Sequence, residues 1–311
     1  MTIDRVLEAL EVRLEPFALC ELHGACTLGL GRRPFAVLHY VLAGSGRVVI
    51  GDLPAFEVSP GTVLLAPAFM PHWLHGSGGR GRPLPNCRPL DLGLDHVVQG
   101  ERDGSNGPTL IAICGRIEVS YRGMRGALNL LKSPIAEHLP PGDRVRSALD
   151  EFVYELANPT VGTRALAKSL MGQCVILLLR RRYRAGDPSL KWMDAAADEA
   201  LWGALQLMLD RPADPHSVES LAAACGMSRA ALARHFGEIY GTGPIELLRT
   251  IRLQRAAELL ARSDLPVKRI AEQVGYTSRS YFTRAFEGLY GASPGQFRST
   301  AREPVSIGGY R

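Results

Sequence analysis

The spacing of apolar residues changes along this 311-residue chain. Between about Cys20 and Val119, short apolar runs alternate with turn residues, a pattern typical of β-strands. Strands are predicted over residues 35–42, 47–50, 61–65 and 109–119. Their close spacing favours a small sandwich or barrel. Residues 76–108 are rich in Gly, Pro and Arg and lack a clear period, which predicts a long surface excursion.

From Asp143 onward the apolar period lengthens to about 3.6 residues, the spacing of an α-helix. A first helix is predicted after Asp143, with one apolar stripe made of Val145, Leu149, Phe152, Val153 and Leu156. A second helix is predicted over 163–183, followed by a linker at 185–188. The pattern from 190 to 298 predicts helices alone.

The C-terminal region repeats itself. Gly226 matches Gly275 at an offset of 49, and further positions match at an offset of 50. These pairs are Ser228 and Ser278, Leu232 and Phe282, Arg234 and Arg284, Phe236 and Phe286, Tyr240 and Tyr290, Gly241 and Gly291, and Pro244 and Pro294. A whole shared register indicates a duplicated structural unit, with the one-residue shift in a turn.

Each copy predicts two helices joined by a tight turn. The short helices 218–224 and 267–274 each end at a glycine that can adopt the left-handed conformation after a helix. Ser228 and Ser278 then offer hydroxyls that suit the free amides of the next helix. Two helices joined this tightly form a helix-turn-helix unit.

The second helix of each copy has an apolar face and an outward face. The positions predicted to be core are Leu232, Phe236 and Ile239 in the first copy and Phe282, Phe286 and Leu289 in the second. The outward positions are Arg229, Ala230, Ala233 and Arg234 in the first copy and Arg279, Ser280, Thr283 and Arg284 in the second. Arginines pair with guanine edges or phosphates and small residues permit close approach, so these faces are the predicted DNA-contacting surfaces. An all-helical interaction domain with solvated arginines is the alternative, but it does not explain the duplication.

A helix predicted from Pro244 to Arg262 separates the copies. Its predicted buried positions are Ile245, Leu248, Leu253, Ala256, Leu259 and Leu260. As a rigid spacer, it would hold two recognition helices about one DNA turn (~34 Å) apart. The flanking cations that are candidates for phosphate contact are Arg249, Arg252, Arg255, Lys268 and Arg269.

The net charge of +5 is compatible with a polyanionic partner but does not by itself predict DNA, because the basic excess is not concentrated in the C-terminal part. The N-terminus lacks the pattern of a secretion signal, and the longest apolar stretch, 174–179, is far shorter than the ~20 residues of a membrane helix. We therefore expect a cytoplasmic protein with no membrane partner. The six cysteines form no CxxC pair, which argues against a zinc knuckle or a secreted disulfide framework.

The C-terminal segments resemble the DNA-binding domain of the AraC/XylS family of bacterial transcription regulators over about residues 195–300. The resemblance rests on segments 218–222, 226–229, 270–276, 282–286 and 291–298. It implies sequence-specific binding of double-stranded promoter DNA, RNA polymerase as a further partner, no catalytic residues and no cofactor. In such proteins the first unit usually supplies most base contacts, which here would depend on Arg229 and Arg234.

The N-terminal region resembles the cupin-type sensor domain often fused in this family, through 61–67 followed by His72 and through 113–118. Enzymatic cupins need paired histidines with a glutamate shortly after, whereas here Val41 stands two positions after His39 and no glutamate occurs before Glu57. A metal-dependent cupin enzyme with a helical extension is the alternative function.

The predicted fold class is therefore α+β. It combines an N-terminal cupin-like β-barrel or sandwich, a helical connector and a C-terminal all-α domain with two helix-turn-helix units. The expected divisions are 1–125 for the sensor domain, 126–190 for the connector, 191–300 for the DNA-binding domain and 301–311 for a flexible tail.

Three kinds of effector chemistry remain open for the sensor domain. A metal would need His39, His72 and His75 to converge. An anionic small molecule, such as a nucleotide second messenger, would use guanidinium groups near one barrel mouth, with residues Arg32, Arg33, His39, Arg80, Arg82, Arg88 and Arg116 as candidates. Oxidation would use a thiol of lowered pKa among Cys20, Cys26, Cys87 and Cys114, of which Cys20 and Cys114 lie in or near predicted strands. Inert buried cysteines and solvated arginines are the corresponding structural alternatives.

The connector carries more apolar surface than one helix face requires. The residues concerned are Leu166, Leu170, Val175, Leu177 and Leu178, which would bury against the sensor domain or a second subunit. We favour a homodimer, because pairing doubles the DNA contacts and raises affinity through effective concentration.

Overall fold

The computed structural model describes residues 3–23, 27–30, 35–76, 83–84, 95–99, 110–122, 128, 131, 133–193 and 199–302. These residues fall into two compact units, which are described separately. The sandwich unit holds the described residues of 11–120 and 125–185. The helical unit holds those of 3–10, 121–122 and 186–302.

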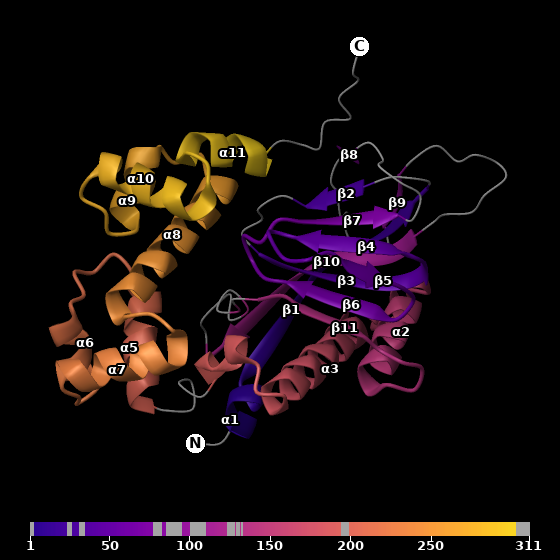
Figure 1. Ribbon diagram of the computed structural model, residues 1–311, viewed down its shortest axis with the longest axis horizontal. Coiled ribbons are helices and arrows are strands. Elements are labelled where there is room, and N and C mark those ends of the chain that lie inside the picture. The colour runs from indigo at the N-terminus through magenta and orange to yellow at the C-terminus, as the bar shows by residue number, and fades with distance from the viewer. Residues whose placement is uncertain are drawn as a thin grey trace, which may run out of the picture. The chain divides into compact units, whose positions relative to one another are not determined.

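Two β-sheets form the sandwich unit (Figure 1). The six-stranded sheet has the order β11-β6-β3-β10-β1-β9, and the five-stranded sheet has the order β5-β4-β7-β2-β8. The strands are β1 Leu10–Leu22, β2 Thr27–Leu30, β3 Ala36–Gly44, β4 Gly46–Ile50, β5 Phe56–Val58, β6 Thr62–Ala66, β7 His72–Gly76, β8 Pro83–Leu84, β9 Asp95–Gln99, β10 Leu110–Tyr121 and β11 Ile135–His138. Buried residues of both sheets form one hydrophobic cluster, so the core lies between the sheets.

The four strands predicted from the apolar runs are confirmed as β3, β4, β6 and β10. The prediction for residues 76–108 was partly wrong, because β8 and β9 lie within that segment and pair in parallel with β2 and β1. The prediction also missed that β1 begins as early as Leu10. Such short or early strands are stabilised by distant partner strands, which local periodicity does not reveal.

Alternation along β3 gives this strand two buried faces. Val41 belongs to the core between the sheets, and His39 lies on the same face, two residues away. Tyr40 points the other way, where its hydroxyl donates to Asp150. On the neighbouring strand, a Cβ added to Gly115 would lie 2.3 Å from the Phe17 ring, so only glycine leaves room for that ring.

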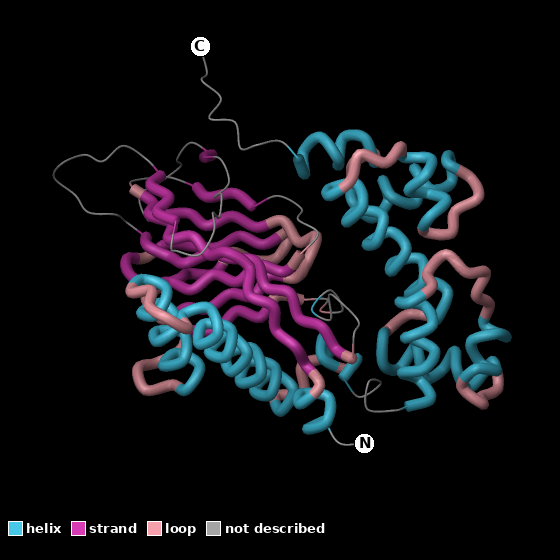
Figure 2. The backbone as a smooth tube through the Cα atoms, turned by 180° about the vertical axis from the view of Figure 1, so that it is seen from behind, coloured by secondary structure: helices cyan, strands magenta, loops and turns pink. Residues whose placement is uncertain are grey.

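Helices α2 (Arg144–Ala157) and α3 (Thr163–Arg184) lie over the six-stranded sheet (Figure 2). The Phe17 ring of β1 packs edge-on against Phe152 of α2, at 5.0 Å between ring centroids. The predicted connector helices are confirmed, and their buried residues are Val145, Leu149, Phe152 and Leu156 in α2 and Val175, Leu177 and Leu178 in α3. Val153 is only half-buried, while Leu166 and Tyr154 are exposed.

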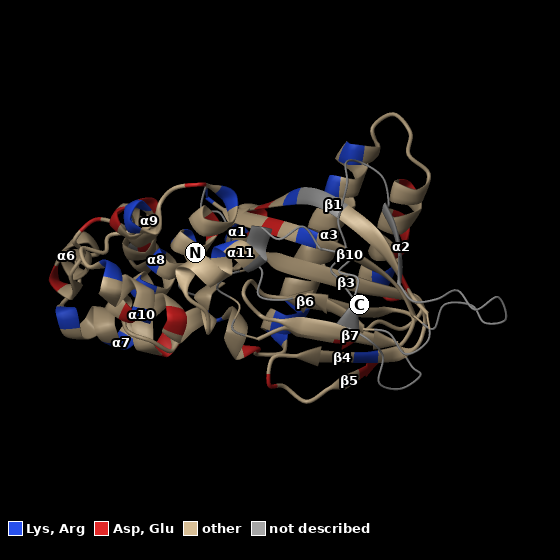
Figure 3. Ribbon diagram, turned by 90° about the horizontal axis from the view of Figure 1, so that it is seen from above, with Lys and Arg blue, Asp and Glu red and all other residues tan. Residues whose placement is uncertain are grey.

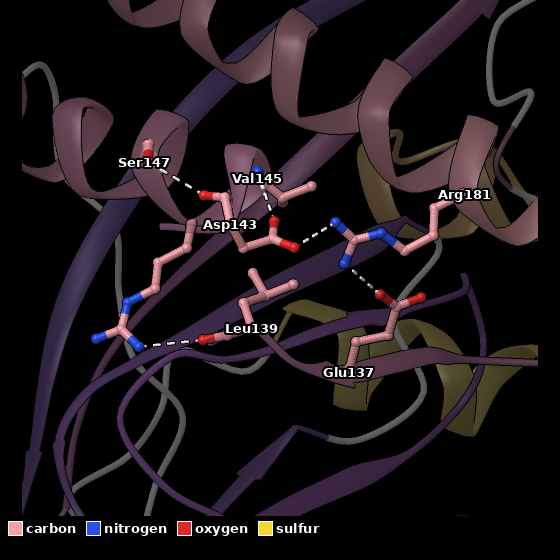
Figure 4. Close-up of polar contacts among 7 residues, drawn as sticks. Glu137, Leu139, Asp143, Val145, Ser147 and Arg181 are labelled. Carbon is pink, nitrogen blue, oxygen red and sulfur yellow. Dashed lines mark hydrogen bonds and ion pairs between the residues drawn. The ribbon is translucent and has the colours of Figure 1, made fainter. Parts of the chain in front are cut away.

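An ion-pair network joins α2, α3 and β11 (Figure 4). Asp143 caps α2 by accepting a hydrogen bond from the amide of Val145 at 2.8 Å. Its other carboxylate oxygen lies 2.6 Å from a guanidinium nitrogen of Arg181 near the end of α3. The second terminal nitrogen of Arg181 lies 3.0 Å from Glu137 of β11. One arginine therefore fixes the start of α2 and the end of α3 to the same sheet edge.

The helical unit consists of helices in its described part. They are α1 Ile3–Glu8, the short 3-10 helix η2 Pro188–Leu190, α5 Glu199–Asp210, α6 Val218–Ala224, α7 Arg229–Tyr240, α8 Pro244–Arg262, α9 Val267–Gln273, α10 Arg279–Tyr290 and α11 Pro294–Arg302. Helix α8 packs against α5, α7, α9, α10 and α11 (Figure 1), which agrees with its predicted role as a spacer. No helix in the described ranges is long and apolar enough to span a membrane.

The prediction of the buried face of α8 was wrong at one end. Ile245 is 42% exposed, while Pro244, Leu247 and Leu248 of the same turn are buried. Leu259 is only partly buried. Because α8 is surrounded by five helices, its buried surface is set by where those helices lie and not by one apolar stripe.

Candidate nucleic-acid interface

The first helix-turn-helix unit consists of α6 and α7. The Ser217 hydroxyl accepts from the Ser220 amide, and the Ser220 hydroxyl accepts from the Ser217 amide, which closes a capping box at the start of α6. Gly226 in the turn has a φ of 64°. The Ser228 hydroxyl then accepts from the Ala231 amide at 3.2 Å and begins α7. The predicted turn glycine and capping serine are confirmed.

The second unit consists of α9 and α10 and shares the turn glycine and the serine cap of the second helix, but α9 begins after Pro266 without a side-chain cap. Gly275 has a φ of 83°, and the Ser278 hydroxyl accepts from the Tyr281 amide at 3.3 Å. Phe282 and Phe286 are buried as predicted. Leu289 was predicted to be core but is 40% exposed, because the last turn of α10 instead buries Tyr290 against Phe297 of α11. Ile239, its counterpart in the first unit, is half-buried.

The outward face of α7 is exposed as predicted at Arg229, Ala230, Ala233 and Arg234. Arg229 lies 2.8 Å from Glu219 of α6, and this ion pair is exposed on both sides. The hydrogen bond from Arg229 lowers the pKa of Glu219 to about 2, so the carboxylate stays charged at neutral pH. Arg234 forms no ion pair or hydrogen bond with the described part of the chain. The α7 face thus presents one arginine tethered to a glutamate and one that is not.

The outward face of α10 carries more varied side chains. Arg279, Ser280 and Arg284 are exposed and Thr283 is half-buried. Tyr281, which the sequence analysis did not single out, is 51% exposed, and its ring tilts against that of Tyr276 at 5.8 Å. The apolar pattern did not mark Tyr281 as outward, because it directly precedes the core residue Phe282. The matching residue in the first copy is Ala231, and a small apolar side chain does not indicate whether its position faces the core or the solvent.

The cations flanking the recognition helices divide into two groups. Arg249, Arg255 and Arg269 each pair with a glutamate three residues away on their own helix. Figure 3 shows basic and acidic residues interspersed along the helices of this unit. Arg252 instead donates to the carbonyl oxygens of Pro212 at 2.6 Å and Asp214 at 2.8 Å. Two of its three guanidinium nitrogens are therefore occupied by the loop between α5 and α6.

The loop of residues 212–214 also contacts the turn of the second helix-turn-helix unit. A Cβ on Gly275 would lie 2.9 Å from both the Cα and the carbonyl oxygen of Ala213 and 3.0 Å from the Arg252 guanidinium. Loop residues 212–214 are thus held between α8 and the turn of the second unit. The loop that leads into the first helix-turn-helix unit is therefore in contact with the turn of the second unit.

The candidate effector residues are only partly within the described chain. Arg32, Arg33, Arg80, Arg82 and Arg88 lie outside the described residues, as do Cys26 and Cys87. Arg116 pairs with Glu118 at 3.1 Å and stacks over the Phe35 ring at 4.8 Å. It lies two positions after Cys114 on β10, on the same strand face. His39 is buried in the core, whereas the Arg116 side chain is partly exposed.

The side chains of Cys114, His39 and His72 lie in the sandwich core and form a continuous series of hydrogen bonds. Nδ1 of His39 lies 2.8 Å from the Cys114 sulfur, and Nε2 of His39 lies 2.8 Å from Nε2 of His72. Nδ1 of His72 lies 2.9 Å from the carbonyl oxygen of Met70. Burial lowers the pKa of His39 well below its ordinary value, with a further contribution from His72.

The three histidines considered as a metal set do not converge. His75 lies on the opposite face of β7 from His72, where its ring hydrogen-bonds to Thr27 at 2.8 Å. His39 has both ring nitrogens occupied on opposite sides of the ring. Among the described residues there is no group of three or more His, Cys, Asp or Glu placed to hold a metal ion. These residues therefore do not fit a cupin metal centre.

Comparisons with known proteins agree with this architecture. Residues 221–300 match a family described as a helix-turn-helix domain, and residues 2–183, more than half of the chain, match the cupin family. The chain is 29% identical to the RCS-specific HTH-type transcriptional activator RclR of Escherichia coli K12, over 90% of this chain and 88% of RclR. It is 30% identical to the HTH-type transcriptional regulator MtrA of Neisseria gonorrhoeae, over 84% of this chain and 85% of MtrA.

A crystal structure of ToxT K231A from Vibrio cholerae covers 93% of this chain and 97% of its own, at 14% identity and a TM-score of 0.45. The two family matches and the extent of the MtrA match agree with the duplicated helix-turn-helix units and the two-sheet domain. The chain belongs to the AraC family of DNA-binding helix-turn-helix transcription regulators and carries an N-terminal cupin domain.

Proposed function

We propose that the protein regulates transcription by placing α7 and α10 in successive major-groove segments on one side of promoter DNA. The observation that carries this proposal is the pair of exposed, cationic helix faces on two units with matching caps and turns. The side chains proposed to contact DNA are Arg229, Ala230, Ala233, Arg234, Arg279, Ser280, Thr283, Arg284 and Arg249.

Arg252 has a different proposed role. Its two hydrogen bonds to the 212–214 loop leave it little freedom to reach a phosphate. We therefore assign it to positioning the two units. The exposed Tyr281 is added as a contact, because a phenol ring offers both an apolar face for a thymine methyl and a hydroxyl for a phosphate.

The test begins with selection of a binding site from random DNA by the full-length protein. Arg234→Ala should weaken binding to the selected site by about 1–3 kcal/mol relative to random DNA. Arg262→Ala removes the same charge from an exposed position at the end of α8 and should leave the preference unchanged. An unchanged preference in Arg234→Ala would contradict the role of this arginine.

The cupin domain is proposed to control DNA binding through an effector, either a small anionic ligand or oxidation of a cysteine. Both relatives named above are transcriptional regulators, which favours regulation over the alternative of a cupin enzyme. RclR is described as an RCS-specific transcriptional activator, which gives one effector class to test on this chain. We retain the proposed domain divisions at 125, 190 and 300.

Further parts of the proposal concern assembly. Exposed apolar side chains gather on the α2–α3 hairpin at Tyr154, Val161 and Leu166, which supports a homodimer through this hairpin. Contact with RNA polymerase and a cytoplasmic location follow from activity at promoters. Sedimentation of the full chain, compared with Leu166→Glu, tests the dimer: a monomeric wild-type protein would contradict it.

A further inference from the structure

In the series of hydrogen bonds in the sandwich core, the donor and the acceptor can be assigned at every contact. A carbonyl oxygen only accepts, so Nδ1 of His72 must carry the proton that it shares with Met70. Burial lowers the pKa of His72, so its ring is neutral and Nε2 is an acceptor. Nε2 of His39 therefore donates to His72. Neutral His39 then has a bare Nδ1, which accepts from the Cys114 thiol.

The Met70 carbonyl that sets this direction is itself held by an unusual turn. Phe69, directly before Met70, has a φ of 64°, a left-handed conformation that is uncommon for a residue other than glycine. Met70 and His72 flank the start of β7, and His39 and Cys114 face each other in the register of β3 and β10. The chain of donors is thus built from both sheets.

The hydrogen-bond partner of Cys114 distinguishes it from Cys174. An imidazole nitrogen can take the thiol proton, whereas Cys20 donates to the carbonyl oxygen of Ala18, at 4.0 Å, which cannot. Cys174 in α3 is also buried, and burial raises its pKa to about 12. No described histidine hydrogen-bonds to Cys174. Of Cys114 and Cys174, only Cys114 therefore has a described histidine in hydrogen-bond contact.

We infer that Cys114, His39 and His72 form a reactive-thiol site at which a small hydroperoxide oxidises Cys114 to a sulfenic acid, with His39 as the base. Its use in regulation rests on the proposed function, whereas its chemistry does not. Thiolates, not thiols, attack peroxides, so a proton acceptor in contact with the sulfur lowers the barrier.

The reaction balances as follows. As the Cys114 sulfur attacks one peroxide oxygen, its proton passes to Nδ1 of His39. A sulfur–oxygen bond forms, and the oxygen–oxygen bond breaks. The departing hydroxide, or the alkoxide from an organic hydroperoxide, takes the proton from His39 and leaves as water or an alcohol, and His39 returns to its neutral form. Sulfur loses two electrons and the peroxide gains them. Throughout, the hydrogen bond that His39 donates to His72 holds the His39 ring in place beside the sulfur.

The test measures hydrogen peroxide reactivity of each cysteine in the full-length, reduced protein. Sulfenic acid is trapped with dimedone, and the labelled peptides are quantified over time by mass spectrometry. Cys114 is expected to label at least about 10-fold faster than Cys174, although both are buried. In urea the two rates should become equal. Labelling of Cys114 no faster than that of Cys174 in the folded protein would overturn the proposal.

The variant His39→Gln tests whether the basicity of His39, and not the access of peroxide to Cys114, sets the labelling rate. The glutamine oxygen can accept the thiol hydrogen bond but cannot take the proton. Labelling of Cys114 should fall about 10-fold or more, while Cys174 and the partly exposed Cys225 keep their rates. His72→Gln should give a smaller fall. If His39→Gln does not fold, the wild-type ratio of Cys114 to Cys174 still decides, and a folded variant with undiminished Cys114 labelling overturns the role of His39.

These assays contain no DNA, so they are independent of the proposed regulator function. A separate titration compares DNA affinity before and after peroxide treatment, in wild type and in Cys114→Ser. A change of affinity in wild type alone supports a regulatory site. Equal affinity in all samples overturns that regulatory use, while the labelling ratio continues to decide the chemistry.

Discussion

The two helix-turn-helix units share a backbone and differ in charge at matched positions, one of which reverses sign. Glu219 of α6 holds Arg229 of α7 in an exposed ion pair. In the second unit Lys268 stands at the position that matches Glu219, next to Arg279, which matches Arg229. The duplication therefore preserved the turn glycine and the serine cap of the second helix and changed side chains that meet solvent. Such a division is expected when two copies must keep one fold but contact different DNA segments.

The interiors of the two units differ as well. In the second unit the rings of Phe282, Phe286, Tyr290 and Phe297 form a continuous aromatic cluster. In the first, Phe236 pairs with Tyr240 at 5.1 Å between centroids. The second unit thus rests on its own aromatic core, closed by α11.

The largest expected effect tests this difference. Phe286→Ala should lower the free energy of unfolding by about 3–5 kcal/mol, because it leaves a cavity at the centre of the cluster. Phe236→Ala should cost about 1 kcal/mol less, since fewer aromatic pairs are lost. Urea unfolding followed by circular dichroism measures both. The exposed Leu289→Ala, on the same helix as Phe286, should stay within about 0.5 kcal/mol of wild type. Equal costs for the two phenylalanines would refute the comparison.

The next effect concerns the contact that joins the units. Arg252→Ala leaves the carbonyl oxygens of Pro212 and Asp214 without their donors, at an expected cost of about 1–3 kcal/mol. Arg252→Lys should recover little, because an ammonium group cannot reproduce the two-point geometry.

The same variants test how the recognition helices are spaced. On a selected DNA site, five base pairs inserted between its two halves should sharply weaken wild-type binding and weaken Arg252→Ala less. Arg255→Ala, which removes an exposed arginine of the same helix, is the control. A variant as sensitive to the insertion as wild type would show that α8 alone sets the spacing.

The capping serines should behave alike in both units. Ser228→Ala and Ser278→Ala each remove one acceptor for a helix amide and should each cost about 1 kcal/mol in thermal or urea unfolding. Ser280→Ala, inside the first turn of α10, should cost much less. A large difference between Ser228 and Ser278 would argue against a common framework.

The smallest effect is the charge difference itself. Glu219→Gln removes a negative charge beside the proposed DNA surface and releases Arg229, so DNA affinity should rise by less than about 10-fold. Lys268→Gln should lower affinity and reduce the salt slope by about 0.9 if this lysine neutralises one phosphate. Titrations at several salt concentrations measure both. A fall in DNA affinity for Glu219→Gln and a rise for Lys268→Gln would indicate that DNA binds another face of the protein.

The pH dependence of this pair has a defined sign. The pKa of Glu219 lies at about 2 in the folded protein, mainly because Arg229 donates a hydrogen bond to it, and is therefore below the unfolded value. Its contribution is complete above the unfolded pKa of about 4.3 and is lost only as the pH falls toward 2. Between pH 5 and 8 the effect of Glu219→Gln on DNA affinity should thus be constant.

Local patterns predicted the helical unit well, because its signals lie within a few residues of each other. Gly226 and Ser228 act on the backbone of their own turn. The buried face of an amphipathic helix can be predicted from the spacing of its own apolar residues. The sandwich was harder, since β9 exists through pairing with β1, more than seventy residues away in the chain.

The sequence by itself determined the duplicated units, their caps, the cationic outward faces and the family. Tertiary structure alone decided that Arg252 binds a loop, that Leu289 and Ile245 face solvent, and that His39 joins Cys114 to His72. The physical reason is distance along the chain. Propensity and periodicity act between neighbours, whereas burial and the partner of a polar group depend on segments that only folding brings together.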